Sequence, residues 1–324
     1  MKLAFIIDPI EALDPGHDTS VALMEAACAA GHQVWVTDIY RLRVKESRAW
    51  ALLTPVQIYP VKLVDDRWIP PYPWYKAEEP QDLSLDSMDV IWMRQDPPVT
   101  IPYLYATYIL DYVDLSQTLV VNAPQGIRAA NEKMYALQFD AVIPRTIVAQ
   151  EKTQILEFVE REKAAVLKPL GGKAGEGILF LEAGDKNLNS MIEISTLRGR
   201  LPVMVQEYLP AAKAGDKRII LMDGDPIGAV NRIPVGREFR GNMATGGRVE
   251  AAEVTARDRF ICEQVKPELE RDGLIFVGID VIGDYLTEVN VTSPTGIREV
   301  DRLSNLSLGQ VVVDWLANRK ALRS

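Results

Sequence analysis

The chain has 324 residues, too many for one compact hydrophobic core, so we expect two or three domains. Its 48% apolar and 25% charged residues are typical of a soluble globular protein, and no apolar run is long enough to predict a transmembrane helix. A net charge of −9 without any basic stretch argues against a nucleic-acid-binding protein. With only two cysteines, far apart, and a strand starting directly after Met1, we expect no disulfide framework and no signal peptide, which fits a reducing cytoplasm.

The first third of the chain predicts a parallel, doubly wound sheet. Strands are expected over residues 2–8, 33–38, 89–93 and 118–122, and helices over 19–30 and 103–113. Asp18 is a candidate N-cap of the first helix, and Gly31 is its left-handed stop. Residues 44–51 could be helix or strand, whereas the proline-rich segment 68–74 predicts an extended surface loop. Pro124 marks a boundary, so the first domain covers about residues 1–122.

The rest of the chain again mixes strands and helices. Strands are expected over 145–148, 164–168, 178–181, 203–209, 217–222 and 227–233. Helices are expected over 127–139, 152–161, 186–197, 255–271 and 306–316. The two histidines, His17 and His32, flank the first helix and are expected on the surface. With so few, a histidine-based zinc site or a Ser-His-Asp triad is not indicated.

Three loops carry residues that suit a binding site. Arg94 and Asp96 follow a buried strand, where ligands bind in open α/β sheets, although the two could instead form a structural salt bridge. The glycine-dense stretch 171–177 could bring backbone N–H groups close to phosphate, or be a plain flexible hairpin loop. It has the spacing of neither a P-loop nor a Rossmann fingerprint. Residues 234–248, polar and rich in Gly and Arg, predict a mobile lid.

A hairpin near the C-terminus carries three oxygen-bearing side chains in an apolar setting: Asp280, Glu288 and Asn290. Glu288 and Asn290 point to the same face of a strand over 286–291. A three-residue loop would place Asp280 opposite Glu288, whereas a two-residue loop would place it opposite Thr287. The first register groups ligands that suit Mg²⁺. The alternative is an edge hairpin with solvated polar residues, but the hydroxyl-rich segment 292–298 that follows favours an anion-contacting loop.

The sequence resembles prokaryotic-type glutathione synthetases from residue 1 to about residue 315. The motifs that carry the resemblance are 93–98 (MRQDPP), 105–110 (YATYIL), 131–133 (NEK), 167–170 (LKPL), 215–218 (GDKR), 240–242 (RGN), 246–248 (GGR) and 273–299 (GLIFVGIDVIGDYLTEVNVTSPTGIRE). The resemblance implies an α/β, ATP-grasp fold with a Rossmann-like pre-ATP-grasp domain over 1–122. A small lid domain over 123–208 and a larger domain over 209–324 would hold ATP between them.

The resemblance also implies roles for individual residues. ATP would be bound by Lys133, Lys168, Gly172, Gly175, Gly177, Glu207, Tyr208, Leu209 and Asp216. The implied ligands of Mg²⁺, with Mn²⁺ as a substitute, are Asp280, Glu288 and Asn290. Arginines near the acyl phosphate would be Arg218, Arg232 and Arg240. The substrate end would be lined by Arg94, Asp96, Asn242, Thr292, Ser293, Thr295 and Arg298. Relatives often have Gly-Met-Gly-Gly in the first glycine loop, where this chain has residues 172–177 (GKAGEG).

The expected reaction is ATP-dependent ligation of γ-glutamylcysteine to glycine through an acyl phosphate. Fixed cations and metal ions would neutralise the transferring phosphoryl group, which fits a sequence with many arginines but no nucleophile–base pair. Two alternatives remain: another ATP-grasp ligase of the D-alanine–D-alanine type, and a non-catalytic ATP-binding protein. The resemblance also implies a cytoplasmic homo-oligomer, a tetramer, with small-molecule substrates and neither nucleic-acid nor membrane partners.

Overall fold

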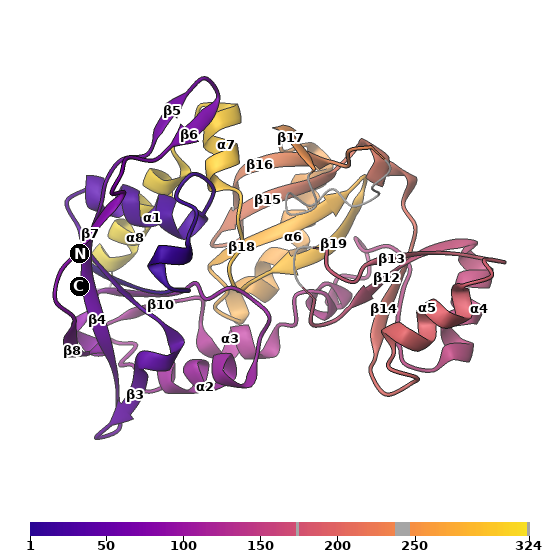
Figure 1. Ribbon diagram of the computed structural model, residues 1–324, viewed down its shortest axis with the longest axis horizontal. Coiled ribbons are helices and arrows are strands. Elements are labelled where there is room, and N and C mark those ends of the chain that lie inside the picture. Colours follow the sequence, from indigo (N-terminus) through magenta and orange to yellow (C-terminus); the bar gives the residue numbers. More distant parts are fainter. Residues whose placement is uncertain (173–174, 237–246, 323–324) are drawn as a thin grey trace.

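The computed structural model describes residues 1–172, 175–236 and 247–322, and its first unit is a mainly parallel sheet (Figure 1). Strands β1 (Lys2–Ile6), β2 (Gln33–Thr37), β9 (Val90–Met93) and β10 (Leu119–Val121) pair in parallel in the order β10-β9-β1-β2. Helix α1 (Thr19–Ala29) is capped by Asp18, whose carboxylate accepts a hydrogen bond from the Val21 N–H at 3.0 Å. The predicted doubly wound start is therefore confirmed.

Antiparallel strands extend this sheet at the β2 edge. Strand β4 (Arg48–Ile58) pairs with β2, β3 (Leu42–Lys45), β7 (Tyr75–Ala77) and β8 (Gln81–Ser84). The ambiguous segment 44–51 is thus part of a β-hairpin. Strands β5 (Lys62–Val64) and β6 (Arg67–Ile69) form a separate hairpin at the top of Figure 1. Helix α2 (Ile101–Leu110) lies below the sheet in the same view.

The middle of the chain forms its own antiparallel sheet and core. Its strands are β11 (Thr146–Ala149), β12 (Ala164–Pro169), β13 (Leu179–Glu182) and β14 (Val203–Glu207), in the order β11-β14-β12-β13. Helices α4 (Lys152–Glu162) and α5 (Leu188–Ser195) supply Ile155, Phe158 and Ile192 to this core. This unit projects to the right in Figure 1.

The helix predicted over 127–139 is wrong. Helix α3 (Pro124–Ala129) ends early, and the 3-10 helix η4 (Met134–Gln138) starts after a break. Asn131 makes the break, because its side-chain oxygen accepts hydrogen bonds from the N–H groups of Lys133 at 3.2 Å and Met134 at 3.1 Å. Glu132 and Lys133 therefore project from an irregular turn that lines the cleft described below.

The last sheet runs in the order β17-β16-β15-β18-β19 and is antiparallel throughout. Its strands are β15 (Asp216–Met222), β16 (Asp225–Ile233), β17 (Arg248–Ala251), β18 (Phe276–Ile282) and β19 (Tyr285–Asn290), and helix α6 (Ala256–Arg271) packs on it. The β18–β19 loop has two residues, yet Asp280 pairs with Glu288, because the ladder shifts register beside Thr287. A β-bulge, which neither predicted register included, thus brings the two carboxylate residues opposite each other.

Two C-terminal helices return to the N-terminal sheet. Helix α7 (Ile297–Ser304), which was not predicted, and α8 (Leu308–Ala321) share one core cluster with α1, β1 and β2. Asn122 joins the first and last sheets, donating to the carbonyls of Phe276 at 2.9 Å and Val291 at 2.8 Å and accepting from the Phe276 N–H at 2.8 Å. The remaining 3-10 helices are η1 (Ile10–Ala12), η2 (Ile39–Arg41), η3 (Leu85–Ser87) and η5 (Pro210–Ala214). Within the described ranges, no helix is long and apolar enough to span a membrane.

Candidate active site

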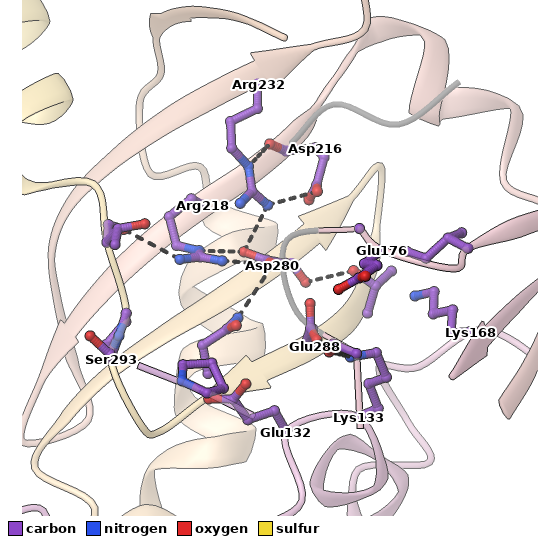
Figure 2. Close-up of a pocket in the computed structure, with 18 of the residues that line it drawn as sticks. Glu132, Lys133, Lys168, Glu176, Asp216, Arg218, Arg232, Asp280, Glu288 and Ser293 are labelled. Carbon is purple, nitrogen blue, oxygen red and sulfur yellow. Dashed lines mark hydrogen bonds and ion pairs between the residues drawn. The ribbon is translucent and has the colours of Figure 1, made fainter. Parts of the chain in front are cut away.

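A cleft of about 590 Å³ is lined by residues of the middle and last sheets and by loops, including those that follow β1 and β9 of the first sheet. Most of the residues expected at a site lie together here (Figure 2). They are Asp96, Lys133, Lys168, Gly172, Gly175, Glu207, Tyr208, Leu209, Asp216, Arg218, Arg232, Asp280, Glu288, Asn290, Thr292, Ser293 and Thr295. The fold therefore gathers side chains that are up to 199 residues apart in the chain, from Asp96 to Thr295, around one cavity.

Two arginines and two aspartates form a buried network on neighbouring strands β16, β15 and β18 (Figure 2). Asp280 accepts hydrogen bonds from Arg218 Nη2 at 2.9 Å and from Arg218 Nε, and Arg232 Nη2 lies 2.9 Å from Asp280 Oδ1. Arg232 Nη2 also donates to Asp216 at 2.6 Å. Burial disfavours the charge of Asp280, but the two guanidinium groups outweigh it and hold the pKa of this carboxyl below its usual range.

Two lysines face the second carboxylate of the hairpin. Lys133 Nζ lies 3.0 Å from Glu288 Oε1 and donates to the Gly172 carbonyl at 2.8 Å. Lys168, on β12, is partly buried in the same cleft, and desolvation lowers its pKa although the negative charge of Glu288 opposes that shift. Two ammonium groups beside a glycine-containing loop can bind a polyphosphate, because each contributes a positive charge without an obligatory partner geometry.

The loop after β19 is clamped from two sides. Glu132 Oε1 accepts hydrogen bonds from the N–H groups of Val291 at 3.0 Å and Thr292 at 3.1 Å, and from Thr292 Oγ1 at 2.8 Å. From the N-terminal unit, Arg94 Nη2 donates to the Pro294 carbonyl at 3.1 Å. The loop that carries Thr292, Ser293 and Thr295 is thereby held against the floor of the cleft.

The part of the cleft formed by the middle sheet and the segment after β14 is mainly apolar, with a few polar groups. Val166, Ile178, Tyr208 and Leu209 line it, together with Glu207 at the end of β14. The Glu207 carboxylate is already paired, with Arg145 Nη2 at 2.5 Å and the Arg145 N–H at 2.9 Å. A flat aromatic ligand such as a nucleobase suits this part, since apolar walls with a few hydrogen-bonding groups are typical of small-molecule sites.

The N-terminal wall of the cleft was missed by sequence reasoning. Asp8, Asp14, His17 and Asp18 all line it. His17 is partly exposed, with 44% of its side-chain surface accessible, which agrees with the expected surface position, but it also borders the cleft. Its Nδ1 lies 2.5 Å from Glu299 Oε1, a hydrogen bond that raises the pKa of His17. The sequence could have indicated Asp8 as a candidate site residue, because it follows the end of a parallel strand, as Arg94 does.

Several expected site residues do not line the cleft. Arg94 is buried and holds the loop at Pro294, while Gly177 lies outside the lining. Arg298 is buried in an ion pair with Glu25 at 2.5 Å, and its guanidinium stacks 4.9 Å from the ring centroid of Trp68. The remaining two, Arg240 and Asn242, lie outside the described residues, as does most of the predicted lid over 234–248.

The donor set of the hairpin fits a hard divalent cation in part. Glu288 is 22% exposed in its side chain and, among the described residues, has one lysine partner. Asn290 uses its amide NH₂ to donate to the Gly278 carbonyl and to Asp280, both at 3.3 Å, leaving its oxygen as a ligand. Asp280 is different, because its carboxylate already has both arginines as partners. Among the described residues, no group of three or more His, Cys, Asp and Glu side chains is arranged to hold a metal ion.

Solved structures establish the fold. An ATP-grasp ligase, PsnB, complexed with its minimal precursor superposes with a TM-score of 0.64 at 19% identity, covering 98% of both chains. The D-cycloserine synthetase DcsG superposes with a TM-score of 0.61 at 15% identity, covering 98% of this chain and 100% of that one. At such identities the likeness shows the fold, which is the ATP-grasp fold.

Comparisons at the sequence level extend over nearly the whole chain. Residues 1–128 match the family of N-terminal domains of prokaryotic glutathione synthetases, and residues 132–305 match the ATP-grasp domain of the same enzymes. The glutathione synthetase of Thermosynechococcus vestitus is 67% identical over 98% of this chain and 99% of its own length. That of a Nostoc species is 63% identical over 98% of both chains. The chain therefore belongs to the prokaryotic glutathione synthetases, ATP-dependent ligases built on the ATP-grasp fold.

Proposed function

We propose that the cleft joins γ-glutamylcysteine to glycine in two steps. The γ-phosphoryl group of ATP is first transferred to the cysteinyl carboxylate, and the amine of glycine then displaces phosphate from the acyl phosphate. The products are glutathione, ADP and phosphate. The observation that carries the proposal is the convergence of Lys133, Lys168, Arg218 and Arg232 on one cleft. Their charges match an intermediate that carries several negative oxygens.

Each group of cations has a separate task in this proposal. Lys133 and Lys168 bind the ATP phosphates, the segment from Glu207 at the end of β14 to Leu209 holds adenine and ribose, and Asp216 also contributes to binding the nucleotide. Arg218 and Arg232 face the acyl phosphate and stabilise the charge that develops on the transferring oxygens. Gly172 and Gly175 supply backbone N–H groups above the phosphates. No covalent nucleophile is required, because the substrate carboxylate itself accepts the phosphoryl group.

We propose that Glu288 and Asn290 hold the divalent metal, Mg²⁺ or Mn²⁺, that accompanies ATP. The metal supplies charge neutralisation at the phosphoryl oxygens. The protein holds the donor atoms in fixed positions on β19, where Glu288 and Asn290 lie on one face of the strand and line the cleft. Asp280, the third expected ligand, is already paired with Arg218 and Arg232.

The peptide substrate is proposed to lie against the N-terminal wall. Thr292, Ser293 and Thr295 offer hydroxyl groups to its carboxylates, and Asp96 faces them across the cleft. Arg240 and Asn242 are proposed to contact the same substrates, on the strength of the family motif alone. We propose that Arg94 and Arg298 act indirectly on the substrate. Arg94 binds the carbonyl of Pro294, and Arg298, paired with Glu25, follows the loop that carries Thr292, Ser293 and Thr295.

The proposal also covers the domain boundaries, the cellular location and the oligomeric state. Each sheet belongs to its own domain, with boundaries near residues 122 and 208 and with helices α7 and α8 returning to the first domain. The family resemblance favours a cytoplasmic homotetramer. Light scattering coupled to gel filtration tests the oligomeric state, and a monomeric mass at micromolar concentration would contradict it.

The test of the activity is phosphate release from Mg-ATP across a matrix of γ-glutamylcysteine, glycine and D-alanine, with products identified by mass. Release that requires both γ-glutamylcysteine and glycine, with glutathione as product, supports the proposal. Release with D-alanine alone would assign a different ligase reaction to the same fold. Absence of release with bound ATP would indicate a non-catalytic nucleotide-binding protein.

The matched variant is Glu288→Gln, which keeps the shape of the side chain and removes one charge. Because Glu288 is proposed to hold the metal, turnover should fall by about 100-fold or more while the thermal unfolding temperature stays close to that of the wild type. Wild-type turnover by this variant at ordinary Mg²⁺ concentration would refute the metal assignment.

A further inference from the structure

The carboxylate of Asp280 is saturated by protein donors. Its side chain is 3% exposed. Oδ1 accepts from Arg218 Nε and lies 2.9 Å from Arg232 Nη2, and Oδ2 accepts from Arg218 Nη2 at 2.9 Å and from Asn290 Nδ2 at 3.3 Å. A carboxylate has about four lone-pair positions, so four donors occupy all of them. A metal ion could bind here only after at least one of these four donors had left.

Glu288, in the register position opposite Asp280, is in a different state. Its side chain is 22% exposed, and among the described residues its ion pair is with one lysine, Lys133, at 3.0 Å. A lysine can leave for an incoming phosphate because its stem is flexible and its charge has no fixed geometry. The bidentate contact of Arg218 with Asp280 is rigid by comparison. The two opposed carboxylates are therefore chemically unequal (Figure 2).

The position of Asp280 explains what the saturated carboxylate does. Arg218 and Arg232 come from adjacent strands, and their like charges would repel each other in a buried site without a counter-charge between them. Asp216 pairs with Arg232 at 2.6 Å, but Asp280, on the strand on the other side of β15, is the carboxylate that binds both guanidiniums and supplies the counter-charge between them. Arg218 Nη1 also donates to the Thr295 carbonyl at 3.3 Å, so the orientation is passed on to the substrate loop.

We propose that Asp280 is a positioning residue, which fixes Arg218 and Arg232 for the transferring phosphoryl group, and that it does not ligate the divalent metal. The proposal rests on the reaction proposed above and changes one of its sequence-based expectations. It assigns the metal to Glu288 and Asn290 alone among the three expected ligands. It also gives Asp280 and Glu288, both on one hairpin, separate tasks that can be separated by experiment.

The experiment compares two isosteric charge removals, Asp280→Asn and Glu288→Gln. Binding of Mn²⁺ in the presence of a non-hydrolysable ATP analogue is measured by the loss of the free Mn²⁺ signal in electron paramagnetic resonance. We expect Asp280→Asn to keep Mn²⁺ affinity within about threefold of the wild type, whereas Glu288→Gln loses about 10- to 100-fold. Turnover should fall in both variants, by about 100-fold or more, since each removes a group needed for charge stabilisation. Equal losses of Mn²⁺ affinity in the two variants would overturn the proposal.

A double-mutant cycle tests whether Asp280 acts through Arg218. If it does, the losses of turnover caused by Asp280→Asn and Arg218→Gln should be less than multiplicative in the double variant, because one of the two groups that Asp280 positions is already gone. Losses that multiply would show an independent role for Asp280 and overturn the proposal. The double variant removes one charge of each sign, so it also carries the Mn²⁺ measurement if the single variant fails to fold.

The outcomes separate this inference from the proposed function. If the wild type does not form glutathione, the proposed reaction fails whatever Asp280 does. If the wild type forms glutathione and Asp280→Asn loses Mn²⁺ affinity as Glu288→Gln does, only the positioning role fails.

Discussion

The ion pair between Lys133 and Glu288 leads to a prediction of gained metal affinity. If Lys133 is replaced by Met, the nucleotide-free protein should bind Mn²⁺ more tightly than the wild type. Met keeps the length and most of the apolar stem of the lysine while removing its charge. Glu288 is then no longer neutralised at 3.0 Å and is open to another cation.

The size of the effect follows from the geometry of the pair. The side chains of Lys133 and Glu288 are 6% and 22% exposed, so the pair is only partly screened by solvent. Coulomb's law at an effective dielectric constant of about 20 gives roughly 5 kcal/mol of gross attraction at this separation. Desolvation offsets most of that attraction. A remainder of about 1–3 kcal/mol corresponds to a rise in Mn²⁺ affinity of about 5- to 150-fold.

The assay is a Mn²⁺ titration without nucleotide, followed by electron paramagnetic resonance. The control is Lys266→Met, which breaks a surface ion pair with Asp225 on the outer side of the same sheet and should leave Mn²⁺ affinity unchanged. In the same Lys133→Met protein, ATP affinity should fall, because a proposed phosphate contact is lost. Unchanged or weaker Mn²⁺ binding by Lys133→Met would refute the idea that Lys133 and the metal compete for Glu288.

Three further variants test the framework of the cleft. Asn122→Ala removes three hydrogen bonds that link β10 to the last sheet and should lower the free energy of unfolding by about 3 kcal/mol in denaturant titrations; a loss below 1 kcal/mol would contradict this role. Glu132→Ala releases the loop at Thr292 and should raise the KM for γ-glutamylcysteine about tenfold with little change in the KM for ATP, whereas equal changes would argue against a local effect. Burial raises the pKa of Asp301 to about 6, so its ionised form destabilises the fold, an effect absent below about pH 4 and complete above about pH 6. Asp301→Asn should therefore add roughly 1 kcal/mol of stability at pH 8, a value discounted for partial exposure, and nothing at pH 4; equal gains at both pH values would refute the titration.

Local patterns in the sequence were sufficient where local forces decide the structure. The strands 2–6 and 90–93 are short apolar runs, and the parallel pairing they predict is present. The cap at Asp18 and the positive φ of 76° at Gly31 both follow from single residues with a strong conformational preference. The motifs of the ATP-grasp domain likewise predict that Lys133, Lys168, Arg218 and Glu288 belong to one site, and all four line the cleft.

Where the chain departs from a regular period, the local pattern was misleading. The apolar spacing over 127–139 fits a helix, yet the Asn131 side chain binds two backbone N–H groups and interrupts it. The sequence left two registers open for Asp280, one for each loop length. The structure combines a two-residue loop with the Glu288 partner, because of a bulge at Thr287 that could not be recognised from residue types.

The sequence by itself determined the family, the parallel strands at the start of the chain and the residue types of the site, because these depend on composition, short periods and motifs. The tertiary structure decided which charges are paired with which. In the folded chain Arg298 pairs with Glu25, Lys133 pairs with Glu288, and Asp280 pairs with two arginines. His17 lies beside the cleft. The physical reason is that an ion pair depends on distances of a few ångströms and on burial, and both arise only when segments far apart in the chain pack together.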